Sequence, residues 1–108
     1  MALKLNAQQV NTRLETGSPV TIIEALPEMY FRKEHLPGAI NLNYDVSDEL
    51  IRERLPDPNA EIIVYCANGP CKNSDILSER LLQLGYLNTV DFHEGKEGWR
   101  EAGFSFER

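Results

Sequence analysis

Short β-branched runs alternate with helical segments along this sequence, and the alternation restricts the folds that the chain can adopt. The apolar runs predict strands over residues 20–23, 39–42, 61–65 and 87–92. Helical periodicity and end signals predict helices over residues 7–16, 27–33, 48–55, 76–84 and 97–102. This order is typical of an α/β domain with a mostly parallel sheet. With no repeat, linker or low-complexity tract, residues 1–108 are expected to form one domain.

Residues with capping chemistry mark the ends of several predicted helices. Asn6, with Gln9 three residues later, has the pattern of a capping box, and Ser47 is a suitable N-cap. Gly85 stands where a helix commonly ends in a left-handed residue. In the helix that Gly85 ends, one apolar stripe is expected to belong to the core: Ile76, Leu77, Leu81 and Leu84.

The composition argues against several classes of function. With 11 Lys and Arg against 17 Asp and Glu, the chain has a net charge of −6. Nucleic acids and anionic membranes both require clustered cations, so neither is an expected partner. No apolar run could span a bilayer, and the first ten residues lack the apolar centre of an export signal. Because two cysteines are also too few for a disulfide framework, a cytoplasmic protein is expected.

The loop after residues 61–65 contains the candidate reactive residues. Cys66 stands at the carboxyl end of the predicted strand, and the loop as far as Ser74 leads into the most regular helix. Amide groups of such a loop can point at one spot, where the helix dipole adds partial positive charge. Since no carboxylate lies between Glu61 and Asp75, we expect Cys66 to have a lowered pKa and to act as a nucleophile. The alternative is that Cys66 is a small, inert core residue.

Three separated segments carry recognisable motifs. They are His-Leu-Pro-Gly-Ala-Ile-Asn at 35–41, Val-Tyr-Cys-Ala-Asn-Gly at 64–69, and Gly-Lys-Glu-Gly-Trp at 95–99 followed by Gly-Phe at 103–104. In order and spacing they resemble the motifs of single-domain rhodaneses, the family of thiosulfate and related sulfurtransferases. The likeness extends over residues 20–104. It implies a rhodanese-like α/β fold, with a five-stranded, mostly parallel sheet flanked by helices on both faces.

The resemblance also implies a mechanism in which Cys66 is the catalytic, sulfur-carrying residue. As a thiolate it would attack the outer sulfur of a donor such as thiosulfate, and then pass that sulfur from its persulfide to a thiol or to cyanide. The residues implied to bind the substrate form the loop: Ala67, Asn68, Gly69, Pro70, Cys71 and Lys72. The implied partners are a small anionic sulfur donor and an acceptor thiol, which could belong to a protein. No cofactor or metal is implied.

The sequence departs from the family pattern at three places. The active loop usually runs Cys-x-x-Gly-x-Arg, whereas Cys71 takes the Arg position here and Lys72 follows it. Since lysine is a point charge without the bidentate fork of arginine, we expect weaker use of thiosulfate. The acid of the usual Asp-x-Arg is retained as Glu24, but Leu26 replaces its Arg. Glu94 replaces the first glycine of the usual Gly-Gly pair.

Other functions are compatible with parts of this pattern. Phosphatases and arsenate reductases of the same fold place an arginine six positions after the cysteine, where this chain has Lys72. A non-catalytic rhodanese-like module would bind a protein, or sense redox state through Cys66 and Cys71. Cys71 itself is either a second reactive thiol or a residue that packs the loop.

The histidines and the single tryptophan have simpler interpretations. His35 is expected to fix the turn at Pro37 through a ring N–H bond, and His93 to lie on the solvated surface. Trp99 is expected to pack near the active loop. The spacing of the two cysteines and the histidines is poor for zinc.

Overall fold

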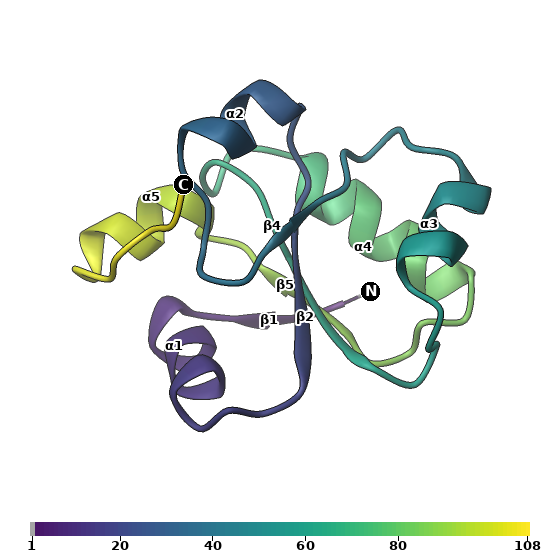
Figure 1. Cartoon of the computed structure of the whole chain (residues 1–108), viewed down its shortest axis with the longest axis horizontal. Coiled ribbons are helices and arrows are strands. Elements are labelled where there is room, and N and C mark those ends of the chain that lie inside the picture. The colour runs from purple at the N-terminus through teal and green to yellow at the C-terminus, as the bar shows by residue number, and fades with distance from the viewer. Residues whose placement is uncertain (1) are drawn as a thin grey trace.

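The computed structural model describes residues 2–108, which form a parallel sheet with helices on both faces (Figure 1). The strands are β1 (Leu3–Leu5), β2 (Val20–Glu24), β3 (Ile40–Asn41), β4 (Glu61–Tyr65) and β5 (Thr89–Phe92). The helices are α1 (Ala7–Glu15), α2 (Glu28–Lys33), α3 (Asp48–Arg54), α4 (Asn73–Gln83) and α5 (Gly95–Glu101). The strand order is β1-β5-β4-β2-β3, and each neighbouring pair is parallel. The predicted five-stranded, mostly parallel α/β fold is confirmed.

Strand β4 lies at the centre of the sheet and is buried on both faces. Its alternate side chains Ile62 and Val64 belong to one apolar cluster, which they share with residues of α3 and α4. Ile63 and Tyr65 belong to a second cluster, shared with residues of α1 and α5. Figure 1 shows these two helix pairs on opposite sides of the sheet. Burial on both sides explains why β4 is a continuous apolar run in the sequence.

The sheet edges differ most from the predicted elements. Strand β1 was not predicted from the sequence, because three residues with a charged Lys4 between two leucines give too short a pattern; it pairs with β5. At the other edge, β3 has two residues instead of the predicted four and pairs only with β2. Leu87, expected in the last strand, is 75% exposed and precedes β5. Edge strands have a single partner, so their length depends on local pairing more than on apolar pattern.

Helix α4 carries polar residues on part of its buried face. Ser74, Leu77, Ser78 and Leu81 are its buried residues, at spacings that place them on one side of the helix. The expectation that Ile76 is a core residue is wrong, since its exposed fraction is 43%. Two serines therefore occupy inward positions near the carboxyl ends of β4 and β5.

No helix within residues 2–108 is both long and apolar enough to cross a membrane.

The capping box of α1 is present as predicted. The Asn6 side chain accepts a hydrogen bond of 2.9 Å from the Gln9 amide, and the Gln9 side chain accepts one of 2.8 Å from the Asn6 amide. Replacing Asn6 by alanine is expected to lower the free energy of unfolding by about 1 kcal/mol, because one amide of the first turn loses its acceptor. Urea denaturation would measure the loss. Gln8→Ala, at an exposed position of the same turn, is the control, and an equal loss there would contradict the capping role.

Candidate active site

Cys66 is the first residue after β4 and is fully buried. Its side chain lies on the α4 side of the sheet, continuing the alternation of Val64 along the strand. The thiol sulfur lies 3.5 Å from Oγ of Ser74, 3.6 Å from the carbonyl oxygen of Cys71 and 3.9 Å from that of Asn68. Two of these three neighbours are carbonyl groups, which accept a hydrogen bond from a thiol but repel a thiolate.

These surroundings raise the pKa of the Cys66 thiol to about 11. Burial is the main cause, because it disfavours the charged form, and the Cys71 side chain acts in the same direction. The hydroxyl and amide of Ser74 lower the pKa, but by less. The sequence-based expectation of a lowered pKa is therefore wrong. A loop at a helix N-terminus stabilises a thiolate through amide groups that face the sulfur; here the Ser74 amide does so, but burial outweighs it.

The predicted binding residues 67–72 lie together in the turn between β4 and α4. The Cys71 amide donates to both the carbonyl oxygen of Asn68, at 3.2 Å, and its side-chain oxygen, at 3.1 Å. Pro70 has no amide hydrogen to offer. Two of the loop amides expected to hold the sulfur are therefore engaged or missing. Lys72 is exposed at the N-cap of α4, and its side chain makes no capping bond.

The start of α5 holds the Cys66 loop from behind. The amide of Lys96 donates to the carbonyl of Cys66 and that of Glu97 to the carbonyl of Ala67, both at 2.9 Å. Gly95 has a positive φ of 62°, and a Cβ atom there would lie 2.3 Å from the Cys66 carbonyl oxygen. These two bonds also explain why α5 begins at Gly95, two residues before the predicted start. Only glycine permits this close approach.

A buried polar network lies behind the Cys66 loop, at the carboxyl ends of β2 and β4. The Glu24 carboxylate is fully buried and lies 3.1 Å from the Lys96 ammonium. It accepts a hydrogen bond of 2.7 Å from the Tyr65 hydroxyl, and Lys96 donates to the Tyr30 carbonyl at 2.9 Å. Burial raises the pKa of Glu24, whereas Tyr65 and Lys96 lower it. The network joins β2, β4, α2 and α5 just behind the loop of Cys66.

A second polar cluster lies on the α4 side, next to Ser74. Asp91 of β5 is 1% exposed, and the Lys4 ammonium lies 3.3 Å from its Oδ2 and 3.5 Å from Oδ1 of Asp75. The donor atoms of Asp75, Asp91 and His93 lie within 4.8 Å of one another, close enough for one cation. Because Lys4 already supplies positive charge to both carboxylates, we assign no metal to them. His93 is half-buried and therefore less solvated than expected.

The other aromatic residues form structural contacts. The His35 ring bonds the Phe31 carbonyl at 2.9 Å and stacks on the Phe31 ring, so its predicted ring bond is present, with a carbonyl of α2 as the partner. Trp99 is buried, and among residues 2–108 its ring packs against Phe92 and Phe104 and not against the active loop beside which it was expected.

Tertiary structure brings carboxylates to a loop that lacks them in sequence. Glu94, Glu97 and Glu101 line a hollow of about 210 Å³ together with Gly69 and Pro70. The stretch free of carboxylates between Glu61 and Asp75 is therefore not an environment free of negative charge. An anionic donor approaching the loop from this side meets acidic side chains.

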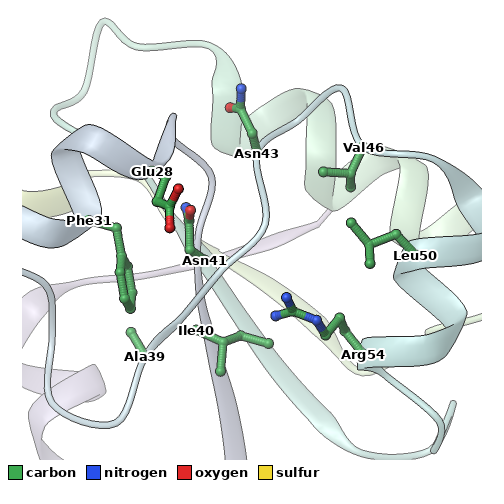
Figure 2. Close-up of a pocket in the computed structure, with 9 residues that line it drawn as sticks. All are labelled: Glu28, Phe31, Ala39, Ile40, Asn41, Asn43, Val46, Leu50 and Arg54. Carbon is green, nitrogen blue, oxygen red and sulfur yellow. The ribbon is translucent and has the colours of Figure 1, made fainter.

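A larger hollow, of about 620 Å³, lies beside the edge strand β3 (Figure 2). Residues of α2, β3 and α3 line it, among them Glu28, Asn41 and Arg54. Neither Cys66 nor any residue of its loop contributes to the lining. The hollow is thus separate from the candidate active site.

Comparison with known families identifies the family of this chain. The sequence model of the Rhodanese-like domain matches residues 6–102. The chain belongs to the rhodanese-like family. The Adenylyltransferase and sulfurtransferase UBA4 of Candida albicans is 31% identical over 86 residues, which cover 74% of this chain and 19% of the relative. The chain thus spans about a fifth of the length of that relative.

Two further proteins are similar to this rhodanese-like chain. The Thiosulfate sulfurtransferase PspE of Escherichia coli is 36% identical over 63 residues, which cover 58% of each chain. The crystal structure of a thiosulfate sulfurtransferase from Pseudomonas aeruginosa superposes with a TM-score of 0.85 and is 26% identical. The match covers 99% of this chain and 20% of that one. The rhodanese-like fold implied by the sequence motifs is therefore confirmed.

Several residues around the loop of this rhodanese-like domain were missed by sequence reasoning. Lys96 pairs with Glu24, Ser74 contacts the thiol, and Asp91 interacts with Ser74. A weak signal existed for two of them. Ser74 lies one turn before the buried Leu77 and Ser78, and Asp91 interrupts an apolar strand. Polar residues at inward positions are uncommon unless they have partners.

Proposed function

We propose that this rhodanese-like domain is a sulfurtransferase that carries sulfane sulfur as a persulfide on Cys66. The observation that carries the proposal is the position of the thiol, at the carboxyl end of the central strand β4. Its loop is held by two hydrogen bonds from backbone amides of α5. Ligand and catalytic sites of open parallel sheets lie at this edge. The names of similar proteins, which include sulfurtransferases, support the same class of reaction.

The proposed cycle has two displacement steps. The Cys66 thiolate attacks the outer sulfur of a donor such as thiosulfate, the sulfur–sulfur bond of the donor breaks, and sulfite leaves with the bonding electron pair. An acceptor thiolate or cyanide then attacks the outer sulfur of the persulfide, and Cys66 leaves as a thiolate. No electron donor or acceptor outside the two substrates is needed.

The donor and its charge follow from the groups around the loop. Residues Ala67 to Lys72 are proposed to bind the donor, with Lys72 supplying the positive charge at the start of α4. The acidic side chains of Glu94, Glu97 and Glu101 oppose a dianion such as thiosulfate. We therefore propose slow use of thiosulfate relative to less charged sulfane donors. A cytoplasmic location would suit two free cysteines, because thiols there stay reduced.

Mass spectrometry of the intact protein after incubation with thiosulfate and neutral polysulfide donors tests the proposal. We expect one added sulfur atom on Cys66 in the wild type and in Cys71→Ser, and none in Cys66→Ala. Thiocyanate formation from cyanide should fall to background in Cys66→Ala, because no other thiol occupies that position. Absence of any sulfur adduct on a reduced, folded wild-type protein would refute the sulfurtransferase proposal.

A redox-sensing module is the second candidate function. The contact between the Cys66 and Cys71 side chains favours it, because a second thiol beside the reactive one can form a disulfide with it after oxidation. Dilute peroxide distinguishes the two functions. A Cys66–Cys71 disulfide without any sulfur adduct would favour the redox module, whereas an adduct that survives in Cys71→Ser favours the transferase.

A further inference from the structure

Three side chains from different elements meet on the α4 face of the sheet. Cys66 follows β4, Asp91 belongs to β5, and Ser74 lies in the first turn of α4. Val64 and Asp91 are partners in the β4–β5 register, so Cys66, two residues after Val64, projects to the same face as Asp91. All three side chains are buried, with residue exposures of at most 1%.

Ser74 lies between the thiol and the carboxylate. Its Oγ is 3.5 Å from the Cys66 sulfur, in a contact where the thiol is the donor. The Ser74 side chain also interacts with the Asp91 carboxyl group and lowers its pKa, although no hydrogen bond of ordinary geometry joins the two in the structure. Oδ1 of Asp91 is buried and has no hydrogen-bond partner among residues 2–108. A buried acceptor without a partner is costly, so it commonly has a role beyond packing.

We propose that Ser74 and Asp91 form a proton relay for Cys66, in which Asp91 is the positioning residue that receives the proton through the Ser74 hydroxyl. The inference rests on the proposed function, because it assumes that Cys66 reacts as a thiolate. The S–H proton passes to Oγ of Ser74, while the Ser74 hydroxyl, turned toward the unpaired Oδ1, passes its own proton to Asp91. The products are a Cys66 thiolate and a neutral Asp91 carboxyl group, with no net change of charge.

The relay gives Cys66 a proton acceptor, which the thiol needs because its burial disfavours ionisation. The raised pKa of the thiol leaves little thiolate at neutral pH, and no carboxylate or imidazole contacts the sulfur directly among the described residues. Burial and the neighbouring Asp75 raise the pKa of Asp91, while Ser74 and Lys4 lower it. A carboxylate with a raised pKa is a better proton acceptor near neutrality than an ordinary one.

The charged groups around both ends of the relay define the competing explanations. Asp91 faces Lys4 from β1, Asp75 from α4 and His93 beyond the end of β5. Cys66 faces Cys71 and Ser74. If Asp91 acts only as a charge, it disfavours the thiolate, and neutralising it would make Cys66 more reactive. If Asp91 accepts the proton, neutralising it makes Cys66 less reactive. The two roles therefore predict opposite changes in the reactivity of Cys66 when Asp91 is neutralised.

The rate of Cys66 alkylation by iodoacetamide, from about pH 5 to about pH 10, tests the relay without any sulfur donor. Every protein carries Cys71→Ser, so that only Cys66 reacts. We expect the parent to show a lower step that follows ionisation of Asp91 and a plateau, because one proton is then shared between thiol and carboxylate. Asp91→Asn and Ser74→Ala should each remove that step and lower the rate at neutral pH at least about tenfold.

Two controls separate the relay from general damage. Ser78→Ala removes a buried serine one turn later on the same face of α4, and His93→Gln removes the imidazole that lies near Asp91; both should keep the lower step. A rate in Asp91→Asn equal to or above that of the parent would overturn the relay, as would retention of the step in Ser74→Ala. Since alkylation needs no donor, absence of a persulfide with an intact lower step would refute the proposed function and leave the relay standing.

Discussion

Replacing Lys96 by methionine is expected to lower the free energy of unfolding by about 3–5 kcal/mol, among the largest losses available in this chain. The substitution removes the ammonium 3.1 Å from the fully buried Glu24 carboxylate and leaves that charge without a counterion. The hydrogen bond from Tyr65 persists, but one neutral donor does not compensate for the charge. The Lys96 bond to the Tyr30 carbonyl is also lost.

Urea denaturation at several pH values would measure this loss and its cause. Burial raises the pKa of Glu24, and without Lys96 the pKa rises further, since that partner lowers it. Protonated Glu24 therefore stabilises the folded state at acidic pH, and this contribution is lost as the pH rises through the folded-state pKa. The deficit of Lys96→Met should thus be small near the ordinary carboxyl pKa and largest at neutral pH.

A surface ion pair provides the matched control for Lys96. Arg32→Met breaks the exposed pair with Glu28, at 3.1 Å, and should cost less than about 0.5 kcal/mol. Adding Glu24→Gln to Lys96→Met should recover part of the loss, because it removes the unpaired charge. Equal losses for Lys96→Met and Arg32→Met, or a deficit that does not vary with pH, would contradict a buried ion pair.

Replacing Gly95 by alanine is expected to displace the Cys66 loop. The new Cβ would lie 2.3 Å from the Cys66 carbonyl oxygen and 2.9 Å from its carbon, so the backbone must move. A non-glycine residue at this positive φ adds about 1–2 kcal/mol of strain, and overpacking adds about 1–3 kcal/mol. We expect a loss of stability of about 2–5 kcal/mol and, if Cys66 carries sulfur, loss of persulfide formation in the fraction that stays folded.

Gly103→Ala separates the strain from the collision. Gly103 also has a positive φ, of 83°, but a Cβ there meets nothing within 4 Å. Its replacement should cost only the conformational strain and leave sulfur uptake by Cys66 unchanged. Thermal unfolding and the persulfide assay on both variants provide the comparison. If the two alanine variants lose stability equally and both keep full sulfur uptake, the close approach of Gly95 to the loop has no structural role.

The central elements of the fold were predictable from local pattern, and the edges were not. The continuous apolar run of β4 and the capping residues Asn6 and Ser47 predicted their elements closely, because caps and buried strands depend on neighbouring residues. Strand β1 was missed and β3 came out shorter than predicted. Both lie at the sheet edges, where pairing with a distant strand decides whether a short segment is extended.

For the candidate site too, some features were predictable from the sequence and others were not. Its location, a thiol between a central strand and a helix, followed from the sequence, as did its likeness to rhodaneses. The pKa of Cys66 was expected to be lowered, whereas the structure raises it. The error arose because the absence of carboxylates along the chain says nothing about burial or about the carbonyl groups of Asn68 and Cys71, which face the sulfur.

Local sequence patterns were enough to predict the order of the helices and of every strand except β1, the rhodanese-like family and the position of Cys66 within the fold. These properties depend on periodicity, turn chemistry and motif spacing, which act over a few residues at a time. Only the tertiary structure pairs Glu24 with Lys96 and brings Ser74 against the Cys66 thiol on the face of the sheet that also holds Asp91. Such contacts set charge and proton affinity through distances of a few ångströms between groups far apart in the chain, so no local pattern encodes them.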